Sequence, residues 1–230
     1  MNSKTYYFVG IGGIGMSAIA RYLKNNGHNI YGYDRTRTQL TAELEKEGMN
    51  VTYEDDINHL PEVIDLAIYT PAIPAENKIL KEIIKRGIQL NKRAFALAEI
   101  VKEKKVIAIA GTHGKTTTSG LLAHLLYNSK IGCSAFLGGI ANNYSTNMLC
   151  DTKSEYVVAE ADEYDRSFLN LNPFVSAITS ISPDHLDIYQ NKENLEQAFA
   201  QFANQTDKNG HVFLKKEVKV EIDEQIKTHT

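Results

Sequence analysis

Short apolar runs alternate with longer stretches in which apolar residues recur at every third or fourth position. The short runs predict buried strands, and the longer spacing predicts helices that place one face on a core. Regular alternation of the two is typical of an α/β fold with a mostly parallel sheet. The predicted strands are 5–9, 29–33, 50–53, 63–69, 88–90, 106–110, 134–137, 156–159, 175–179 and 211–214, and the predicted helices are 14–25, 40–46, 76–86, 94–101, 115–129 and 194–203.

A charged segment, Lys102-Glu103-Lys104-Lys105, interrupts this alternation, and a second α/β pattern follows it. We therefore expect two domains, residues 1–103 and 104–230. The last stretch, 215–230, is polar and shows no apolar face, so we predict no packed element there. The second domain is accordingly expected to be incomplete at its C-terminus.

Composition and charge narrow the possible functions. The 230 residues carry 25 basic and 28 acidic side chains, a net charge of −3, so we expect no basic surface of the kind that binds nucleic acid. Cys133 and Cys150 are too few for a disulfide framework and stand in no metal-ligand spacing. No apolar run reaches membrane-spanning length and the N-terminus lacks a secretory pattern, so we expect a cytoplasmic protein with no membrane partner.

The first glycine-rich turn, Gly10-Ile11-Gly12-Gly13-Ile14-Gly15, matches G-x-G-x-x-G and stands between a predicted strand and a predicted helix. Glycines at this spacing permit a tight turn and let backbone N–H groups approach a phosphate at the helix N-terminus. Asp34 ends the next strand, where an acidic residue commonly binds a ribose hydroxyl. The pattern suits NAD(P), FAD or another diphosphate such as UDP, and taken alone it favours a dinucleotide.

A second glycine-rich turn contains the candidate ATP-binding residues Gly111, Thr112, His113, Gly114, Lys115, Thr116 and Thr117. It is a shortened P-loop, because Ile109 stands where the full pattern has glycine. In such a loop backbone N–H groups and the helix dipole hold phosphates, Lys115 reaches the β- and γ-phosphate oxygens, and the Thr116 hydroxyl ligates Mg²⁺. An oxidoreductase needs only the first turn and a simple kinase only the second, whereas a ligase that activates a nucleotide-linked acid uses both.

Two polar segments follow predicted strands of the second domain, at the strand ends where α/β proteins bind ligands. The first, Glu160–Asp165, offers carboxylates for Mg²⁺ on ATP phosphates, although acidic loops of this kind are often merely solvated. The second, Ser182–Asp187, flanks His185 with two aspartates and makes it a candidate metal ligand or orienting donor, with a structural histidine as the alternative. A third turn, Gly138–Asn143, is either an ordinary loop or a close approach to substrate.

Four segments together resemble the Mur ligases, namely 10–16 (GIGGIGM), 111–118 (GTHGKTTT), 160–165 (EADEYD) and 184–189 (DHLDIY). The resemblance covers nearly the whole chain. His113 is similar to the residue found in the alanine-adding branch and in the related branch that recycles murein tripeptide. Two features favour the alanine-adding branch, namely Gly12-Gly13 in the first turn and the segment Asp187-Ile188-Tyr189.

The resemblance implies a Rossmann-like N-terminal domain that holds a UDP-sugar, followed by a P-loop-type α/β domain that binds Mg·ATP. The implied UDP-sugar-binding residues are Gly12, Gly13, Ile14, Gly15, Asp34 and Thr70. The implied Mg²⁺ ligands are Thr116, Glu160 and His185. The implied catalytic residues are Lys115, Glu160 and His185.

The implied reaction joins L-alanine to UDP-N-acetylmuramate in peptidoglycan synthesis through an acyl phosphate, with positioning and charge neutralisation as the source of catalysis. Ser180 and Ser182 depart from the family, which commonly has Asn and Glu there, and Ala200 lies near the position where other branches carry a carbamylated lysine. The family also has a third domain that binds the amino acid and that the chain does not reach, so we expect the chain alone to ligate poorly or not at all.

Three alternatives stay open at this point. One is a murein-tripeptide ligase acting on the same UDP-sugar. Another is an NAD(P)-dependent oxidoreductase, which leaves the turn at 111–118 unexplained. The third is a non-catalytic sensor of a UDP-sugar or ATP, and the oligomeric state is likewise open.

Overall fold

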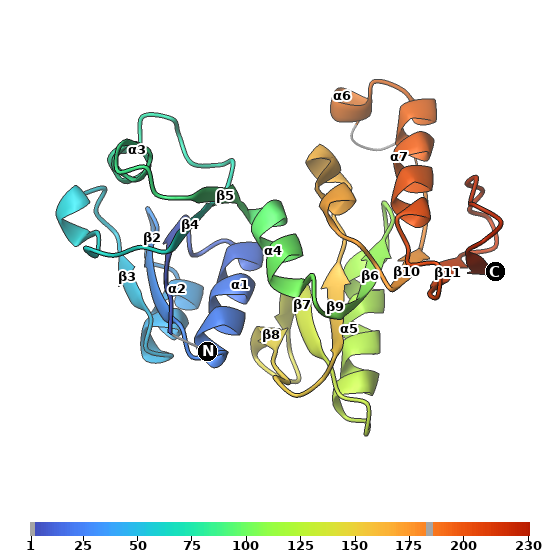
Figure 1. Ribbon diagram of the computed structural model, residues 1–230, viewed down its shortest axis with the longest axis horizontal. Helices are drawn as coiled ribbons and strands as arrows, with labels where there is room; N and C mark the ends of the chain where they lie inside the picture. The colour runs from blue at the N-terminus through green and yellow to red at the C-terminus, as the bar shows by residue number, and fades with distance from the viewer. Residues whose placement is uncertain (1–2, 183–185) are drawn as a thin grey trace. The chain divides into compact units, whose positions relative to one another are not determined.

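The computed structural model describes residues 3–182 and 186–230, and the chain folds into two compact units, Met1–Ala96 and Leu97–Thr230 (Figure 1). In each unit, helices pack against a mainly parallel sheet. The α/β class predicted from the alternating pattern is therefore confirmed. The division between the units falls within helix α4 (Arg93–Val101), just before the charged segment 102–105.

The first unit contains a five-stranded parallel sheet in the order β3-β2-β1-β4-β5. Its elements are β1 (Thr5–Val9), α1 (Ile14–Asn25), β2 (Asn29–Tyr33), α2 (Gln39–Lys46), β3 (Asn50–Thr52), the 3₁₀ turn η1 (Ile57–His59), β4 (Leu66–Tyr69), α3 (Lys78–Lys85) and β5 (Leu90–Lys92). The strand order changes direction between β1 and β4, which makes the sheet Rossmann-like. Ligands of such sheets bind beside this reversal, where the turn 10–15 leaves β1.

Local chemistry explains where the elements of this unit begin and how they pack. Phe8 and Val9 are fully buried, as expected for a central parallel strand that is covered on both faces. Helix α1 buries Ile19 and its neighbours against the sheet. Thr38 starts α2 with a capping box in which its hydroxyl accepts from the N–H of Thr41, and thereby satisfies a donor that has no partner within the helix.

The second unit contains a seven-stranded sheet in the order β12-β11-β10-β6-β9-β7-β8, in which only the β7–β8 pair is antiparallel among the described strands. Its elements are β6 (Lys105–Ala110), α5 (Lys115–Tyr127), β7 (Ser134–Ala141), β8 (Thr146–Leu149), β9 (Tyr156–Glu160), the 3₁₀ helix η2 (Tyr164–Asn170), β10 (Val175–Ile178), α6 (Leu186–Tyr189), α7 (Lys192–Asn204), β11 (His211–Leu214) and β12 (Lys227–His229). The carboxyl ends of β6, β9 and β10 meet at one edge, where the polar segments lie.

Some predicted elements differ from those observed. Strand β4 begins at Leu66 and not at 63, because Val63 is 68% exposed and lies in the loop that precedes the strand. Strand β8 was not predicted, since its four residues form an edge held by pairing with β7. Strand β12 lies within the stretch 215–230 where no element was predicted; its side chains are exposed, so backbone pairing with β11 forms it without an apolar pattern.

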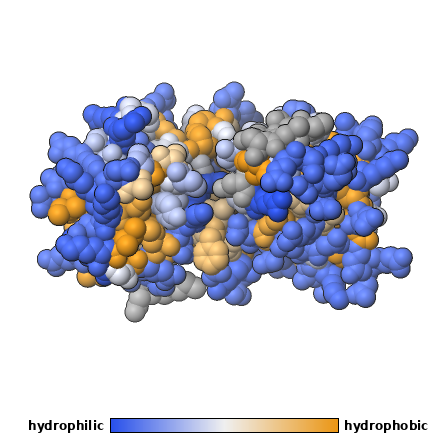
Figure 2. Space-filling view, turned by 90° about the horizontal axis from the view of Figure 1, so that it is seen from above, coloured by the Kyte–Doolittle hydropathy of each residue, from blue (hydrophilic) through white to orange (hydrophobic). Residues whose placement is uncertain are grey.

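The distribution of hydrophilic and hydrophobic residues can be followed over one face of the molecule and along its helices. On the face shown in Figure 2, hydrophilic residues cover most of the surface, with smaller hydrophobic patches among them. Within residues 3–182 and 186–230, no helix has both the length and the apolar character needed to cross a membrane.

Candidate functional site

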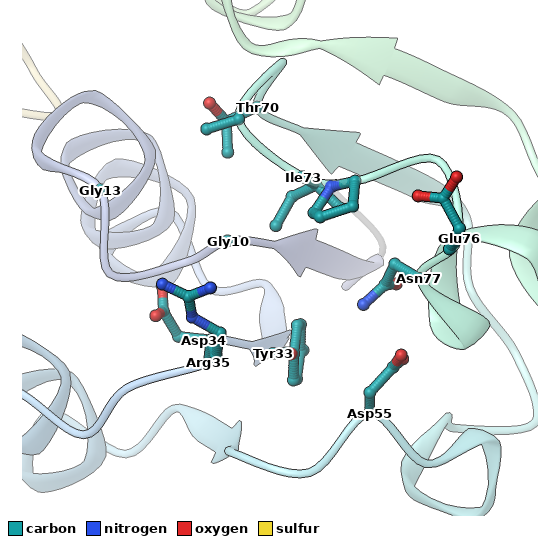
Figure 3. A pocket seen from close by; sticks show the side chains of 12 residues that line it. Gly10, Gly13, Tyr33, Asp34, Arg35, Asp55, Thr70, Ile73, Glu76 and Asn77 are labelled. Carbon is teal, nitrogen blue, oxygen red and sulfur yellow. The ribbon is translucent and has the colours of Figure 1, made fainter.

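A cavity of about 510 Å³ opens in the first unit beside the glycine-rich turn (Figure 3). Its walls come from the ends of β1, β2 and β4, from the loop after β3 and from the segment that precedes α3. The lining residues are Gly10, Gly13, Tyr33, Asp34, Arg35, Asp55, Thr70, Ala72, Ile73, Pro74, Glu76 and Asn77. The volume is sufficient for a nucleotide-sized ligand.

Asp34 holds the glycine-rich turn in place. Its Oδ2 atom accepts a hydrogen bond of 2.8 Å from the N–H of Gly12, and its Oδ1 atom accepts one of 3.2 Å from the N–H of Thr36. The N–H groups of Gly10 and Ile11 both donate to the carbonyl of Tyr33. The carboxylate at the end of β2 therefore fixes the loop and also lines the cavity.

The structure brings part of the expected UDP-sugar set together around the cavity. Gly13, Asp34 and Thr70 line it, while Gly12 is joined to it through Asp34. Ile14 and Gly15 lie in the first turn of α1 and are not among the lining residues.

Several lining residues were missed by sequence reasoning. The carboxylate of Asp55 accepts from the N–H groups of Lys78 and Ile79, at 2.9 and 3.0 Å, and so caps α3. Arg35 is exposed and makes no hydrogen bond or ion pair within the described ranges, which leaves a guanidinium at the cavity for an anion. The only signal in the sequence was its place directly after Asp34. Burial, and then the Asp55 carboxylate, raise the pKa of Tyr33, so its phenol stays protonated near neutral pH.

The second site is the shortened P-loop between β6 and α5. Gly111 has φ +133°, and a Cβ atom there would lie 2.2 Å from Thr179 Oγ1 and 2.8 Å from the backbone nitrogen of Ser180. Only glycine fits this close approach of two loops. Gly114 is the N-cap of α5, and the first N–H groups of an α-helix have no acceptor within it. Thr117 is exposed in that first turn.

The loop after β10 joins the P-loop through side-chain hydrogen bonds. Thr179 Oγ1 donates to the carbonyl of His113 at 2.6 Å, and Ser180 Oγ accepts from the N–H of His113 at 2.8 Å. Thr112 Oγ1 lies 3.1 Å from Ser180 Oγ and accepts from the N–H of Ser182 at 3.0 Å. Ser180 therefore has a definite role in shaping the loop. No motif in the sequence indicated this contact.

Lys115 and Glu163 form an ion pair at the base of the P-loop. Lys115 Nζ lies 2.8 and 3.0 Å from the two carboxylate oxygens of Glu163, and it donates to the carbonyl of Gly111 at 2.7 Å. The Lys115 side chain is 14% exposed and that of Glu163 is fully buried. Sequence reasoning grouped Glu163 with the acidic segment and gave it no role of its own.

Glu160 and Thr116 meet at the open edge of the sheet. The Thr116 hydroxyl donates to Glu160 Oε1 at 3.0 Å, and the N–H of Gly138 donates to Glu160 Oε2 at 3.1 Å. A hydroxyl and a carboxylate are hard oxygen donors that suit Mg²⁺. Among the described residues no three His, Cys, Asp or Glu side chains are grouped as a complete metal site, so bound Mg²⁺ would need phosphate oxygens and water as further ligands. His185 lies outside the described residues.

Comparison with known proteins identifies the family. The model of the Mur ligase family, catalytic domain, matches residues 5–105, and that of the Mur ligase middle domain matches residues 109–229. The chain is 49% identical over 217 residues to the UDP-N-acetylmuramate–L-alanine ligase of Porphyromonas gingivalis, covering 92% of this chain and 48% of that protein. It is 47% identical over 231 residues to the enzyme of the same name from Cytophaga hutchinsonii, covering 97% and 49%.

A solved structure agrees with this match. The UDP-N-acetylmuramate-alanine ligase of Thermotoga maritima superimposes with a TM-score of 0.83 at 31% identity, covering 93% of this chain and 49% of that one. The chain thus spans about half the length of the curated relatives it matches. Two family models in sequence order account for nearly every residue, and both glycine-rich turns lie within them, so the chain belongs to the Mur ligase family.

Proposed function

We propose that the chain is the UDP-sugar- and ATP-binding part of a cytoplasmic, ATP-dependent ligase that joins L-alanine to UDP-N-acetylmuramate. The observation that supports this best is the presence of two separate nucleotide-type sites, one in each unit, in a chain whose relatives are named for that one activity. A dinucleotide oxidoreductase would leave the P-loop without a use.

In this proposal the first unit holds the UDP-sugar. The glycine-rich turn offers backbone N–H groups to the diphosphate, with Gly12 held by Asp34. Arg35 supplies a positive charge at the cavity, while Thr70 and Gly13 form its walls. The roles of Ile14 and Gly15 would be indirect, through the start of α1.

The second unit would hold Mg·ATP. Lys115 donates to the β- and γ-phosphate oxygens, and the residues from Gly111 to Thr117 surround the phosphates with backbone N–H groups and hydroxyls. Thr116 and Glu160, with His185, are the proposed ligands of Mg²⁺, which when bound supplies neutralisation of phosphate charge. Lys115 adds a fixed cation beside the transferred phosphoryl group.

In the proposed reaction the muramate carboxylate takes the γ-phosphoryl group of ATP, which releases ADP and gives an acyl phosphate. The amine of L-alanine then attacks the acyl carbon, and phosphate leaves as the amide bond forms. The alternative acceptor, murein tripeptide, would use the same UDP-sugar and the same phosphates. The two differ only in the amine, so the difference lies in the amino-acid site.

Calorimetric titration of the purified chain with UDP-N-acetylmuramate, and separately with NAD⁺, tests the proposal. Binding of the UDP-sugar without binding of NAD⁺ is expected, because the second site and the named relatives indicate a ligase. Binding of NAD⁺ without binding of the UDP-sugar would overturn the proposal in favour of a dinucleotide enzyme.

A further inference from the structure

The buried carboxylate of Glu163 forms an ion pair with Lys115, the lysine of the P-loop. Glu163 follows Glu160 by three residues, at the same end of β9, yet the two carboxylates have different partners. Glu160 is bound by Thr116 and Gly138, whereas both oxygens of Glu163 accept from Lys115. The acidic segment therefore contains two carboxylates with separate tasks.

The acceptors around the Lys115 ammonium are as many as its hydrogens. An ammonium group carries three N–H bonds. In the described part of the chain, Lys115 Nζ has three acceptors within 3.0 Å, which are Gly111 O and the two oxygens of Glu163. A phosphate oxygen therefore competes with these acceptors for the hydrogens of the ammonium. The Glu163 bonds are the ones to yield, because Gly111 O belongs to the loop that surrounds the phosphates.

Glu163 is not positioned to follow the lysine toward a ligand. The hydroxyl of the buried Tyr189 donates to the backbone carbonyl of Glu163, and Asn194 Nδ2 donates to the carbonyl of Tyr189 at 2.8 Å. The start of α7 thus fixes the backbone that carries the carboxylate.

We propose that Glu163 is a positioning residue that holds the Lys115 ammonium through its buried carboxylate, and that ATP competes with Glu163 for this ammonium. This inference rests on the proposed nucleotide site. Separating a buried ion pair has a free-energy cost. This cost makes the free energy of ATP binding less favourable, and the affinity for ATP is lower as a result.

The test is the dissociation constant for Mg·ATP of the purified chain and its variants, measured by calorimetry. Glu163→Gln removes the charge that competes for Lys115, so its affinity is expected to be about tenfold higher than wild type. Glu163→Asp keeps the charge but shortens the side chain by one methylene, and affinity should rise in the same direction by a smaller factor. Comparison of the two variants therefore separates the effect of losing the contact with Lys115 from the effect of losing the negative charge.

A matched control comes from the same segment. Asp162 carries the same charge one residue earlier, and its Oδ1 atom accepts from the N–H of Tyr164. Asp162→Asn therefore lowers the acidity of the segment by the same amount without touching the ion pair. Its affinity for Mg·ATP is expected to equal that of the wild type. If Asp162→Asn raised the Mg·ATP affinity as much as Glu163→Gln does, the cause would be general repulsion between the acidic segment and the phosphates. That result would overturn the proposal.

Thermal unfolding without nucleotide supplies the second readout. The proposal expects Glu163→Gln to unfold at a lower temperature than wild type and yet to bind Mg·ATP more tightly. A purely structural role would lower both stability and affinity, and that outcome in both Glu163 variants would overturn the proposal. If neither the wild type nor any variant binds Mg·ATP, the proposed nucleotide site itself is wrong.

Discussion

The hydroxyl of Thr116 donates to the carboxylate of Glu160 at 3.0 Å, across the ends of two adjacent strands. Thr116 comes from the first turn of α5, and Glu160 is the last residue of β9. The parallel pairing of β6 with β9 brings these two ends together. A pair of oxygen donors is thus assembled from residues 44 positions apart in the sequence.

The backbone of Gly138 sets the position of this carboxylate. A Cβ atom at Gly138 would lie 2.2 Å from Glu160 Oε2, so Gly138→Ala must displace the carboxylate. We expect Mg·ATP affinity to fall by about tenfold or more, as for loss of a charged hydrogen-bonding contact. Calorimetry of Mg·ATP binding measures the change.

Gly139→Ala is the matched control, because the nearest atom to its added Cβ would be Thr116 Cγ2 at 3.9 Å. It should bind Mg·ATP as the wild type does. Equal losses in the two variants would show that the turn itself, and not the displaced carboxylate, controls affinity.

Gly111 should be the least replaceable glycine of the P-loop. Gly111→Ala meets both a positive φ and a contact of 2.2 Å with Thr179 Oγ1, so we expect the free energy of unfolding to fall by about 2 kcal/mol or more. Gly120, inside α5, has no atom within 4 Å of an added Cβ, and Gly120→Ala should raise stability by about 0.5–1 kcal/mol. Urea unfolding of both variants checks the opposite signs, and a loss of stability in both would contradict this account.

The two proposed nucleotide sites should respond to mutation independently, because each is built within one unit. Asp34→Asn replaces an acceptor of the Gly12 N–H and should weaken binding of UDP-N-acetylmuramate while Mg·ATP affinity stays unchanged. Lys115→Ala should weaken Mg·ATP binding by about 10- to 100-fold and leave the UDP-sugar affinity unchanged. Loss of both ligands in a variant that still unfolds cooperatively would disprove this division.

Cys133 should make stability fall at alkaline pH. Burial raises the pKa of its thiol to about 11, above its value in the unfolded chain, so the folded state binds more protons between these pH values. Stability is therefore complete below pH 9 and declines as pH rises toward 11. Relative to Cys133→Ala, the wild type should lose about 1–3 kcal/mol over this range, measured by urea unfolding at successive pH values. Parallel curves for the two proteins would refute the prediction.

Much of the architecture was predictable from the sequence alone. The alternation of apolar runs with helical spacing indicated the α/β class, since strands and helices differ in the period at which their side chains face a core. The two glycine-rich turns marked the loops that we propose as phosphate sites, because only glycine permits such close backbone approach, as at Gly111. These signals are local, so they survive in a linear sequence.

Tertiary structure alone decided which side chains meet. Neither the pairing of Glu163 with Lys115 nor the contact of Ser180 with His113 follows from any spacing, because each joins residues that parallel strand order brings to one sheet edge. Strand β12 likewise depends on backbone pairing with β11, because its exposed side chains leave no apolar period to detect. The sequence by itself determined the class of fold and the place of the two glycine-rich loops. Strand order determined the partners of each charge, since charges buried at a shared edge must be paired where they meet.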